Sequence, residues 1–135
     1  MIFTSDSSIQ TEKIGADFAN GLRPGDFVAL YGDLGAGKTA FVRGAVSVLN
    51  PRAPVCSPTY SIVNCYGGDP RIYHFDLYRI EDEDDLYSTG YYDYIEEGAI
   101  VFCEWCEKVP SAIPDNAIKV KITGSGDAER VIEIC

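Results

Sequence analysis

Basic residues are scarce in this sequence. Its 135 residues include 11 Lys and Arg against 21 Asp and Glu, a formal net charge of −10. Proteins that bind nucleic acids tightly use clustered Lys and Arg to neutralise phosphates, so direct, tight RNA or DNA binding is not expected. Long apolar runs are missing as well, and none approaches the roughly 20 residues that a membrane-spanning helix needs. Residues 1–18 lack the basic start and continuous apolar stretch of a signal peptide. We therefore expect no membrane association and a cytosolic location.

Histidine is rarer still, since His74 stands alone, and this limits metal chemistry. The five cysteines are odd in number and scattered, which favours free thiols over a disulfide framework. Only Cys103 and Cys106 have a spacing that suggests a metal or redox pair, and no second pair at zinc spacing accompanies them. Because Cys103 ends an apolar stretch, we interpret both as structural thiols, with a redox dithiol as the open alternative.

The sequence does contain a phosphate-binding motif. Residues 32–39 read Gly-Asp-Leu-Gly-Ala-Gly-Lys-Thr and match G-x-x-x-x-G-K-[ST] at every fixed position. An apolar stretch at 27–31 predicts a buried strand before it, and apolar residues three and four apart predict a helix after it. In a strand–loop–helix order, backbone N–H groups surround a phosphate. Lys38 then supplies positive charge, and Thr39 offers a hydroxyl to Mg²⁺.

Two acidic residues follow predicted strands. Residues 60–66 and 71–78 predict a hairpin, and Asp76 lies near the end of its second strand. The run at 99–103 is the most continuous apolar stretch in the chain and predicts a central strand, which Glu104 closes. An acid directly after four apolar residues is the Walker B pattern, whose carboxylate binds Mg²⁺ directly or through water. Asp76 and Glu104 are therefore candidates for the same phosphate site.

The remaining pattern defines the expected fold. Ser7 and Gln10 predict a capping box for a first helix, and residues 118–122 and 131–134 predict a C-terminal hairpin. Pro110 and Pro114 indicate a loop before that hairpin. We expect one P-loop domain over residues 1–135, an α/β layered fold with helices flanking a mixed sheet. The sheet is expected to be parallel around the P-loop and antiparallel elsewhere.

Two stretches each allow two interpretations. Thr59, in Ser-Pro-Thr-Tyr at 57–60, either senses a terminal phosphate, as loops of nucleotide switches do, or simply begins a strand after a turn. Residues 81–97 contain eight acids, no Lys or Arg, and four tyrosines in a predicted tyrosine-rich turn. This stretch is either a solvated helix face or a surface that docks a basic partner.

Four blocks in this order resemble the TsaE family, formerly YjeE, small bacterial P-loop proteins of tRNA threonylcarbamoyladenosine modification. The blocks are the motif from Gly32, Ser-Pro-Thr-Tyr from Ser57, His-Phe-Asp-Leu-Tyr-Arg from His74, and Glu104-Trp105 after an apolar strand. The similarity runs from about Thr11 to Arg130.

The resemblance implies roles for individual residues. ATP phosphates would be held by Leu34, Gly35, Ala36, Gly37, Lys38 and Thr39. Thr39 and Glu104 would serve Mg²⁺, and Asp76, together with Glu104 and Lys38, would be needed for hydrolysis. Further nucleotide contacts would come from Thr11 near the base, Thr59 at the phosphate, Trp105 beside the site and Arg130 of the C-terminal strand. One departure is Ala40, where the family commonly has a second threonine, so a hydroxyl that could reach the α-phosphate is missing.

The resemblance also implies partners. Family members act with the TsaB and TsaD proteins, and their ATP hydrolysis supports turnover of that complex. Contact with tRNA is therefore expected only indirectly.

Other functions built on the same loop fit the sequence less well. A small-molecule P-loop kinase would need arginines to hold an acceptor, and the arginines here are scattered with no arginine-rich lid. A GTP switch would need an Asn-Lys-x-Asp segment, which is absent. An interaction protein with a vestigial loop would have no reason to keep Lys38, Thr39, Asp76 and Glu104 together.

Overall fold

The computed structural model describes residues 1–33, 35–53, 55, 62–124 and 129–135. The strands are β1 (Ile2–Ser5), β2 (Phe27–Tyr31), β3 (Val63–Gly67), β4 (Ile72–Asp76), β5 (Ile100–Glu104), β6 (Ile118–Thr123) and β7 (Arg130–Ile134). The α-helices are α1 (Ser8–Ala19), α2 (Lys38–Leu49), α3 (Glu83–Ser88) and α4 (Tyr91–Glu96). Two 3₁₀-helices, η1 (Cys106–Lys108) and η2 (Pro110–Ala112), lie between β5 and β6. None of these helices is long and apolar enough to cross a membrane.

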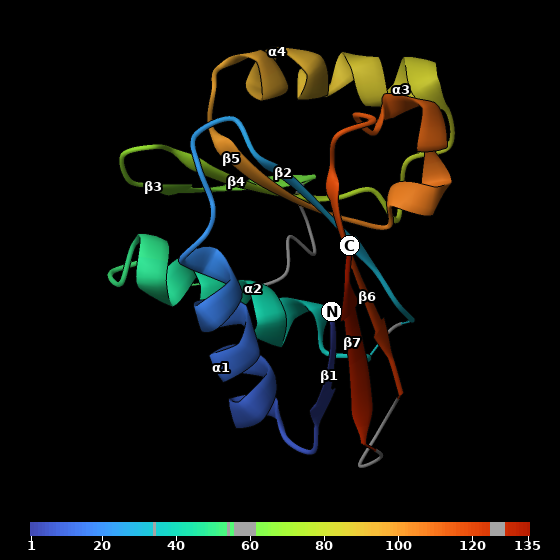
Figure 1. The fold of residues 1–135 in the computed structure, drawn as a ribbon. Coiled ribbons are helices and arrows are strands. Elements are labelled where there is room, and N and C mark those ends of the chain that lie inside the picture. Colours follow the sequence, from blue (N-terminus) through green and yellow to red (C-terminus); the bar gives the residue numbers. More distant parts are fainter. Residues whose placement is uncertain (34, 54, 56–61, 125–128) are drawn as a thin grey trace.

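The strands form one mixed sheet in the order β1-β7-β6-β2-β5-β4-β3. Strand β2 runs parallel to both neighbours, β5 and β6, and β4 runs parallel to β5. The outer pairs β3–β4, β6–β7 and β1–β7 are antiparallel. Figure 1 shows the resulting twist, with β3 and β4 running across the view and β6 and β7 running down it. The predicted α/β fold with a mixed sheet is confirmed.

Helices cover both faces of the sheet, so each face has its own apolar core. Helices α1 and α2 lie on one face, and α3 and α4 lie on the other (Figure 1). Strand β2 shows the alternation, since Val28 and Leu30 belong to the first core, and Phe27 and Ala29 belong to the second. All five residues of β5 are buried, as predicted for a central strand covered on both faces.

Helices α1 and α2 cross at two glycines. A Cβ added to Gly15 would overlap the carbonyl oxygen of Phe41, and a Cβ added to Gly44 would overlap that of Glu12. Without side chains at these positions the two backbones come into direct contact. Because α2 begins at Lys38, this crossing fixes the helix that follows the phosphate motif.

Three parts of the chain differ from the prediction. Strand β1 was not anticipated, because only four residues form it and it owes its place to pairing with β7. The predicted tyrosine-rich turn is wrong, because Gly90, at a φ of 84°, separates α3 from a second helix, α4. The buried Tyr91 begins that helix, and its hydroxyl donates to the Ala112 carbonyl at 3.1 Å. The loop predicted around Pro110 contains the 3₁₀-helix η2.

Candidate phosphate-binding site

The phosphate motif occupies the predicted position between β2 and α2. Gly35 and Gly37 have φ values of 79° and 107°, which glycine adopts without strain. Gly37 is the N-cap of α2, and no side chain caps the helix. The first N–H groups of a helix have no partner within it, so this uncapped end offers donors and a positive dipole to an anion.

Lys38 lies within the motif. Its side chain is buried, and its Nζ donates to the Gly32 carbonyl at 2.7 Å. The same Nζ lies 4.0 Å from the centre of the Trp105 ring. A second pairing within the loop joins the Ala36 N–H to the Asp33 carbonyl at 3.0 Å. The lysine charge is thus held at the start of the loop by a carbonyl and an aromatic ring.

The two predicted acids lie side by side at the edge of the sheet next to the motif. Asp76 and Glu104 are register partners on the parallel strands β4 and β5, and Leu30 of β2 pairs with Glu104 on the other side. Since the carboxyl ends of parallel strands meet at one edge, β2 delivers the motif to the same edge. The structure therefore brings Lys38, Asp76 and Glu104 to one region.

Burial raises the pKa of Asp76 above its usual value, and the negative charge of Glu104 raises it further. The Tyr78 N–H, which donates to Asp76 Oδ1 at 2.9 Å, acts in the opposite direction. The positive charge of Lys38 also lowers this pKa. Asp76 is therefore an acid held in an environment that disfavours its charge, as is common at functional sites.

The donor chemistry at this edge fits Mg²⁺. Glu104 supplies a carboxylate and Thr39, the second residue of α2, supplies a hydroxyl, and both are hard oxygen ligands. Within the described part of the chain, no group of three or more His, Cys, Asp or Glu side chains could hold a metal by itself.

Two residues of the site were missed by sequence reasoning as functional candidates. His74 is fully buried, and its Nε2 hydrogen-bonds Glu104 Oε2 at 2.5 Å. Its Nδ1 hydrogen-bonds the hydroxyl of the buried Tyr66 at 2.7 Å. The sequence placed His74 on the same strand face as Asp76 and at the start of the block His-Phe-Asp-Leu-Tyr-Arg, but neither signal indicates its contact with Glu104.

Arg130, at the start of β7, contacts the backbone of the motif with its side chain. Its Nε donates to the Ala36 carbonyl at 2.9 Å, and its terminal NH₂ donates to the Gly35 carbonyl at 3.1 Å. One guanidinium thus fixes two successive peptide groups of the loop. A direct contact of Arg130 with the nucleotide stays a prediction.

Thr11 lies close to the motif from the side of α1. A Cβ at Gly37 would lie 3.8 Å from the Thr11 methyl group. The Thr11 hydroxyl is buried and lies 2.7 Å from the Ser5 hydroxyl, in a hydrogen bond at the end of β1. A base contact by Thr11 stays a prediction, and Leu34 and Thr59 lie outside the described residues.

Trp105 borders the motif directly after Glu104. Its φ of 59° is a left-handed conformation that is uncommon for a residue with a side chain. Its ring lies 4.9 Å from that of Tyr78, and it lines a hollow of about 470 Å³ together with Gly32 and Asp33. The structure therefore places Trp105 beside the loop, and a contact with nucleotide stays a prediction.

The two thiols that flank Glu104-Trp105 are buried. Cys106 Sγ donates to the Cys103 carbonyl at 3.1 Å. Burial raises the pKa of Cys103 well above its usual value, so this thiol stays protonated at neutral pH. These contacts agree with a structural interpretation.

Comparison with known proteins gives one consistent family. The model of the family described as threonylcarbamoyl adenosine biosynthesis protein TsaE matches residues 5–132. A tRNA threonylcarbamoyladenosine biosynthesis protein TsaE from Bacillus subtilis is 37% identical over 121 residues, which are 89% of this chain and 73% of the relative. The protein of the same name from Treponema pallidum is 30% identical over 130 residues, 96% of each chain.

A solved structure extends the similarity to the fold. The crystal structure of Bacillus subtilis YdiB superimposes with a TM-score of 0.80 at 27% identity, covering 99% of this chain and 83% of that one. Together with the phosphate motif and the acids at the adjoining strand ends, these matches show that the chain belongs to the TsaE family of tRNA threonylcarbamoyladenosine biosynthesis proteins.

Proposed function

We propose that this chain is a Mg²⁺-dependent ATPase that supports threonylcarbamoyladenosine modification of tRNA. It binds and hydrolyses ATP, weakly alone and faster with its partners, and acts on a complex of TsaB and TsaD so that this complex can turn over. One observation carries the proposal: Lys38, at the uncapped end of α2, lies in the same region as Asp76 and Glu104 at the ends of the adjoining strands.

Each group has a role that its chemistry supports. The N–H groups at the start of α2 and the Lys38 ammonium bind the phosphates, and Lys38 exchanges its bond to the Gly32 carbonyl for one to phosphate. Thr39 and Glu104 hold Mg²⁺, which neutralises phosphate charge when it is bound. Asp76, whose raised pKa makes it a better proton acceptor than an ordinary aspartate, orients the attacking water.

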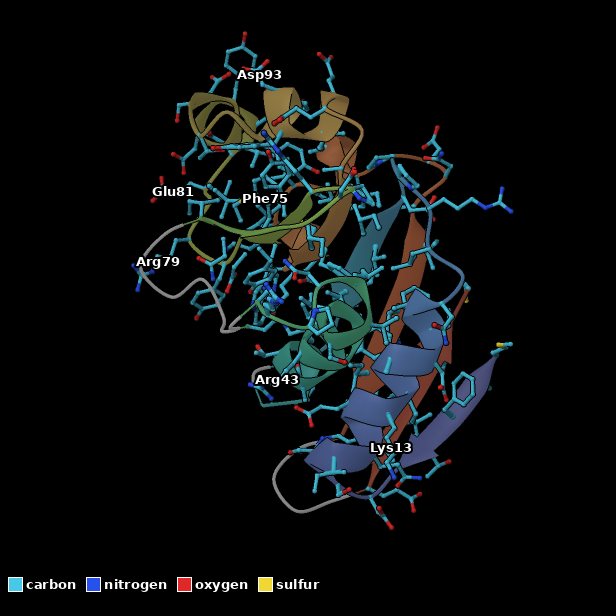
Figure 2. The ribbon with its side chains drawn as sticks, turned by 90° about the vertical axis from the view of Figure 1, so that its left-hand side faces the viewer. Lys13, Arg43, Phe75, Arg79, Glu81 and Asp93 are labelled. Atoms are coloured by element: carbon cyan, nitrogen blue, oxygen red, sulfur yellow. The ribbon has the colours of Figure 1, made fainter. Side chains whose placement is uncertain are left out.

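Partner contact is assigned to the surface of α3 and α4. Tyr87 is 73% exposed there, amid the acids of residues 81–97. Figure 2 shows Asp93 at the outer side of α4, away from the sheet. Acids can steer a basic partner to this surface, and the exposed tyrosine supplies contact area. Contact with tRNA by this chain itself is opposed by its net charge of −10.

Three of the described arginines do not favour the kinase alternative. Arg43 pairs with Glu12 at 3.1 Å and Arg71 pairs with Glu97 at 3.3 Å, both on exposed surfaces. Arg130 holds the loop carbonyls. These three are therefore engaged in contacts other than an acceptor pocket.

One experiment tests the proposal. ATP hydrolysis is measured for the chain alone, with TsaB and TsaD, and with a panel of phosphoryl acceptors, and ATP affinity is measured by titration calorimetry. Lys38→Ala should weaken ATP binding about 10- to 100-fold, because a charged hydrogen bond to phosphate is lost. Lys119→Ala, at an exposed position on β6, is the control and should bind ATP normally.

Two near-isosteric variants test the acids. Asp76→Asn and Glu104→Gln should keep the fold and lower partner-stimulated hydrolysis about 100-fold or more. Unchanged hydrolysis in both would remove the carboxylates from the mechanism, and phosphoryl transfer to one of the acceptors would favour the kinase.

A further inference from the structure

A buried chain of hydrogen bonds leads from strand β3 to the candidate Mg²⁺ ligand. It runs from the Tyr66 hydroxyl to His74 Nδ1, and from His74 Nε2 to Glu104 Oε2. His74 and Tyr66 are 0% and 8% exposed, and the Glu104 side chain is 4% exposed. Both nitrogens of the imidazole are thus used inside the protein.

This chain of hydrogen bonds joins residues from three adjacent strands. His74 and Glu104 lie on the neighbouring parallel strands β4 and β5, and Tyr66 lies on β3. The register of β3 shifts between Cys65 and Gly67, so Tyr66 is the extra residue of a bulge. A bulge re-aims a side chain, and here the Tyr66 hydroxyl meets His74.

The donor of each hydrogen bond in this series follows from elementary chemistry. An ionised Glu104 can only accept, so the hydrogen in its bond to His74 belongs to Nε2. A neutral imidazole then has an unprotonated Nδ1, which accepts from the Tyr66 hydroxyl. Among the described residues, His74 holds Oε2 of Glu104 by this hydrogen bond. The other carboxylate oxygen, Oε1, is then available to a ligand.

We propose that His74 is a positioning residue that fixes the Glu104 carboxylate for Mg²⁺, and that Tyr66 holds the His74 ring in the orientation that makes this possible. The inference rests on the proposed function, because it assigns Glu104 to Mg²⁺. Partners behind a metal ligand hold its orientation, and their loss typically costs about 10- to 100-fold in metal affinity or activity.

The first measurement does not depend on activity. Because His74 is the single histidine of the sequence, ¹⁵N labelling of histidine gives the two ring-nitrogen signals of one imidazole in the NMR spectrum of the full chain. We expect the hydrogen between His74 and Glu104 to belong to Nε2. Tyr66→Phe should leave this hydrogen on Nε2, because Glu104 still accepts it, but should shift the Nδ1 signal, which loses its hydrogen-bond partner. A ring that carries its hydrogen on Nδ1 alone in the unaltered chain, or an Nδ1 signal unaffected by Tyr66→Phe, overturns the proposal.

The second measurement follows Mg²⁺ in hydrolysis by the chain with TsaB and TsaD. His74→Leu should raise the Mg²⁺ concentration for half-maximal rate, or lower kcat, by about 10-fold or more, while ATP affinity in Mg²⁺-free buffer is retained. His74→Gln can still donate to Glu104 from its side-chain amide and should recover most of the loss. Tyr66→Phe should show a smaller shift in the same direction.

Failure of this inference differs from failure of the proposed function. Absence of hydrolysis in the unaltered chain with both partners overturns the function, and the NMR result still decides the tautomer. Normal hydrolysis and Mg²⁺ dependence in His74→Leu overturns the positioning role alone. Equal loss in His74→Gln and His74→Leu also overturns it, because a purely structural histidine would not be rescued by a donor. Should His74→Leu fail to fold, Tyr66→Phe and His74→Gln decide by the same readouts.

Discussion

Gly44 in α2 lies directly against the backbone of Glu12 in α1, so closely that a single added carbon would overlap the Glu12 carbonyl oxygen. Backbone atoms cannot move aside as the end of a flexible side chain can. A methyl group here must push the two helices apart.

Gly44→Ala should therefore destabilise the chain by about 3 kcal/mol or more, the upper range for overpacking. Urea unfolding followed by circular dichroism measures it. Gly21→Ala is the control, because a Cβ there would meet the Phe18 carbonyl oxygen only at 3.8 Å. Equal midpoints for the two variants would contradict the close crossing of α1 and α2.

The stability of the chain should depend on pH through Asp76. Burial raises its folded pKa, so the stability that the group contributes is fully present below its ordinary pKa and is lost as pH rises through the folded value. Asp76→Asn carries no charge at any pH. In Mg²⁺-free buffer at neutral pH it should unfold at a higher temperature than the unaltered chain, and the difference should shrink below pH of about 4.

Thermal unfolding across the pH range tests this, with Asp17→Asn at an exposed position of α1 as the control. If Asp76→Asn is less stable than the unaltered chain at pH 7, the charged acid stabilises the fold and its pKa in the folded chain is not raised.

Arg130 should support nucleotide binding through the loop carbonyls. Arg130→Lys keeps the charge and loses the planar fork that spans Gly35 and Ala36, so ATP affinity should fall about tenfold. Calorimetric titration measures the change. Arg71→Lys, at an exposed ion pair with Glu97, is the matched control and should bind ATP as before. Full affinity in Arg130→Lys would show that the loop needs no such support.

Charge reversal on α3 and α4 should weaken partner docking. Asp82 caps α3 by accepting from the Asp85 N–H, so the test spares these residues and changes the exposed acids Asp84, Asp93 and Glu96 to lysine. We expect at least about tenfold weaker binding to TsaB and TsaD, with ATP affinity of the isolated chain nearly unchanged.

The control reverses the same number of charges elsewhere, at the exposed Asp6, Asp17 and Glu133. Equal binding by both triple variants would mean that the surface of α3 and α4 is merely solvated. Tight, salt-sensitive tRNA binding by the unaltered chain alone would contradict indirect action.

The cysteines should differ in reactivity according to burial. Cys65 and Cys135 are exposed, whereas Cys103 and Cys106 are buried. Alkylation of the folded chain, followed by peptide mass spectrometry, should modify the first two and leave the second two unmodified. Elemental analysis should find no stoichiometric zinc, because within the described residues these thiols have no further ligands that would complete a metal site. One zinc per chain would overturn the structural interpretation.

The parts of the fold that sequence could predict are those with local signals. The phosphate motif, its flanking strand and helix, and the apolar run before Glu104 each have a period or a fixed spacing. The four residues of β1 have neither, because their strand conformation depends on β7, more than a hundred positions away in the chain. Similarly, α4 depends on a glycine turn and on burial of Tyr91 against a distant loop.

The residues of the candidate site also fall into those that local sequence patterns predict and those that they do not. Lys38, Asp76 and Glu104 could be named from motifs and strand ends. The Tyr66–His74–Glu104 chain could not, because it requires the register of three strands and a bulge that no local pattern specifies. The loop contacts of Arg130 also depend on where the sheet brings β7.

Ser5 and Arg130 are register partners in the pairing of β1 with β7, and the Ser5 hydroxyl hydrogen-bonds Thr11 beside the loop. The first five residues therefore brace the phosphate motif from two directions, although they lie outside every motif. Substitutions in β1, tags fused to it, or its deletion would therefore weaken nucleotide binding. A genetic screen would then map such defects to a strand that a motif search never selects.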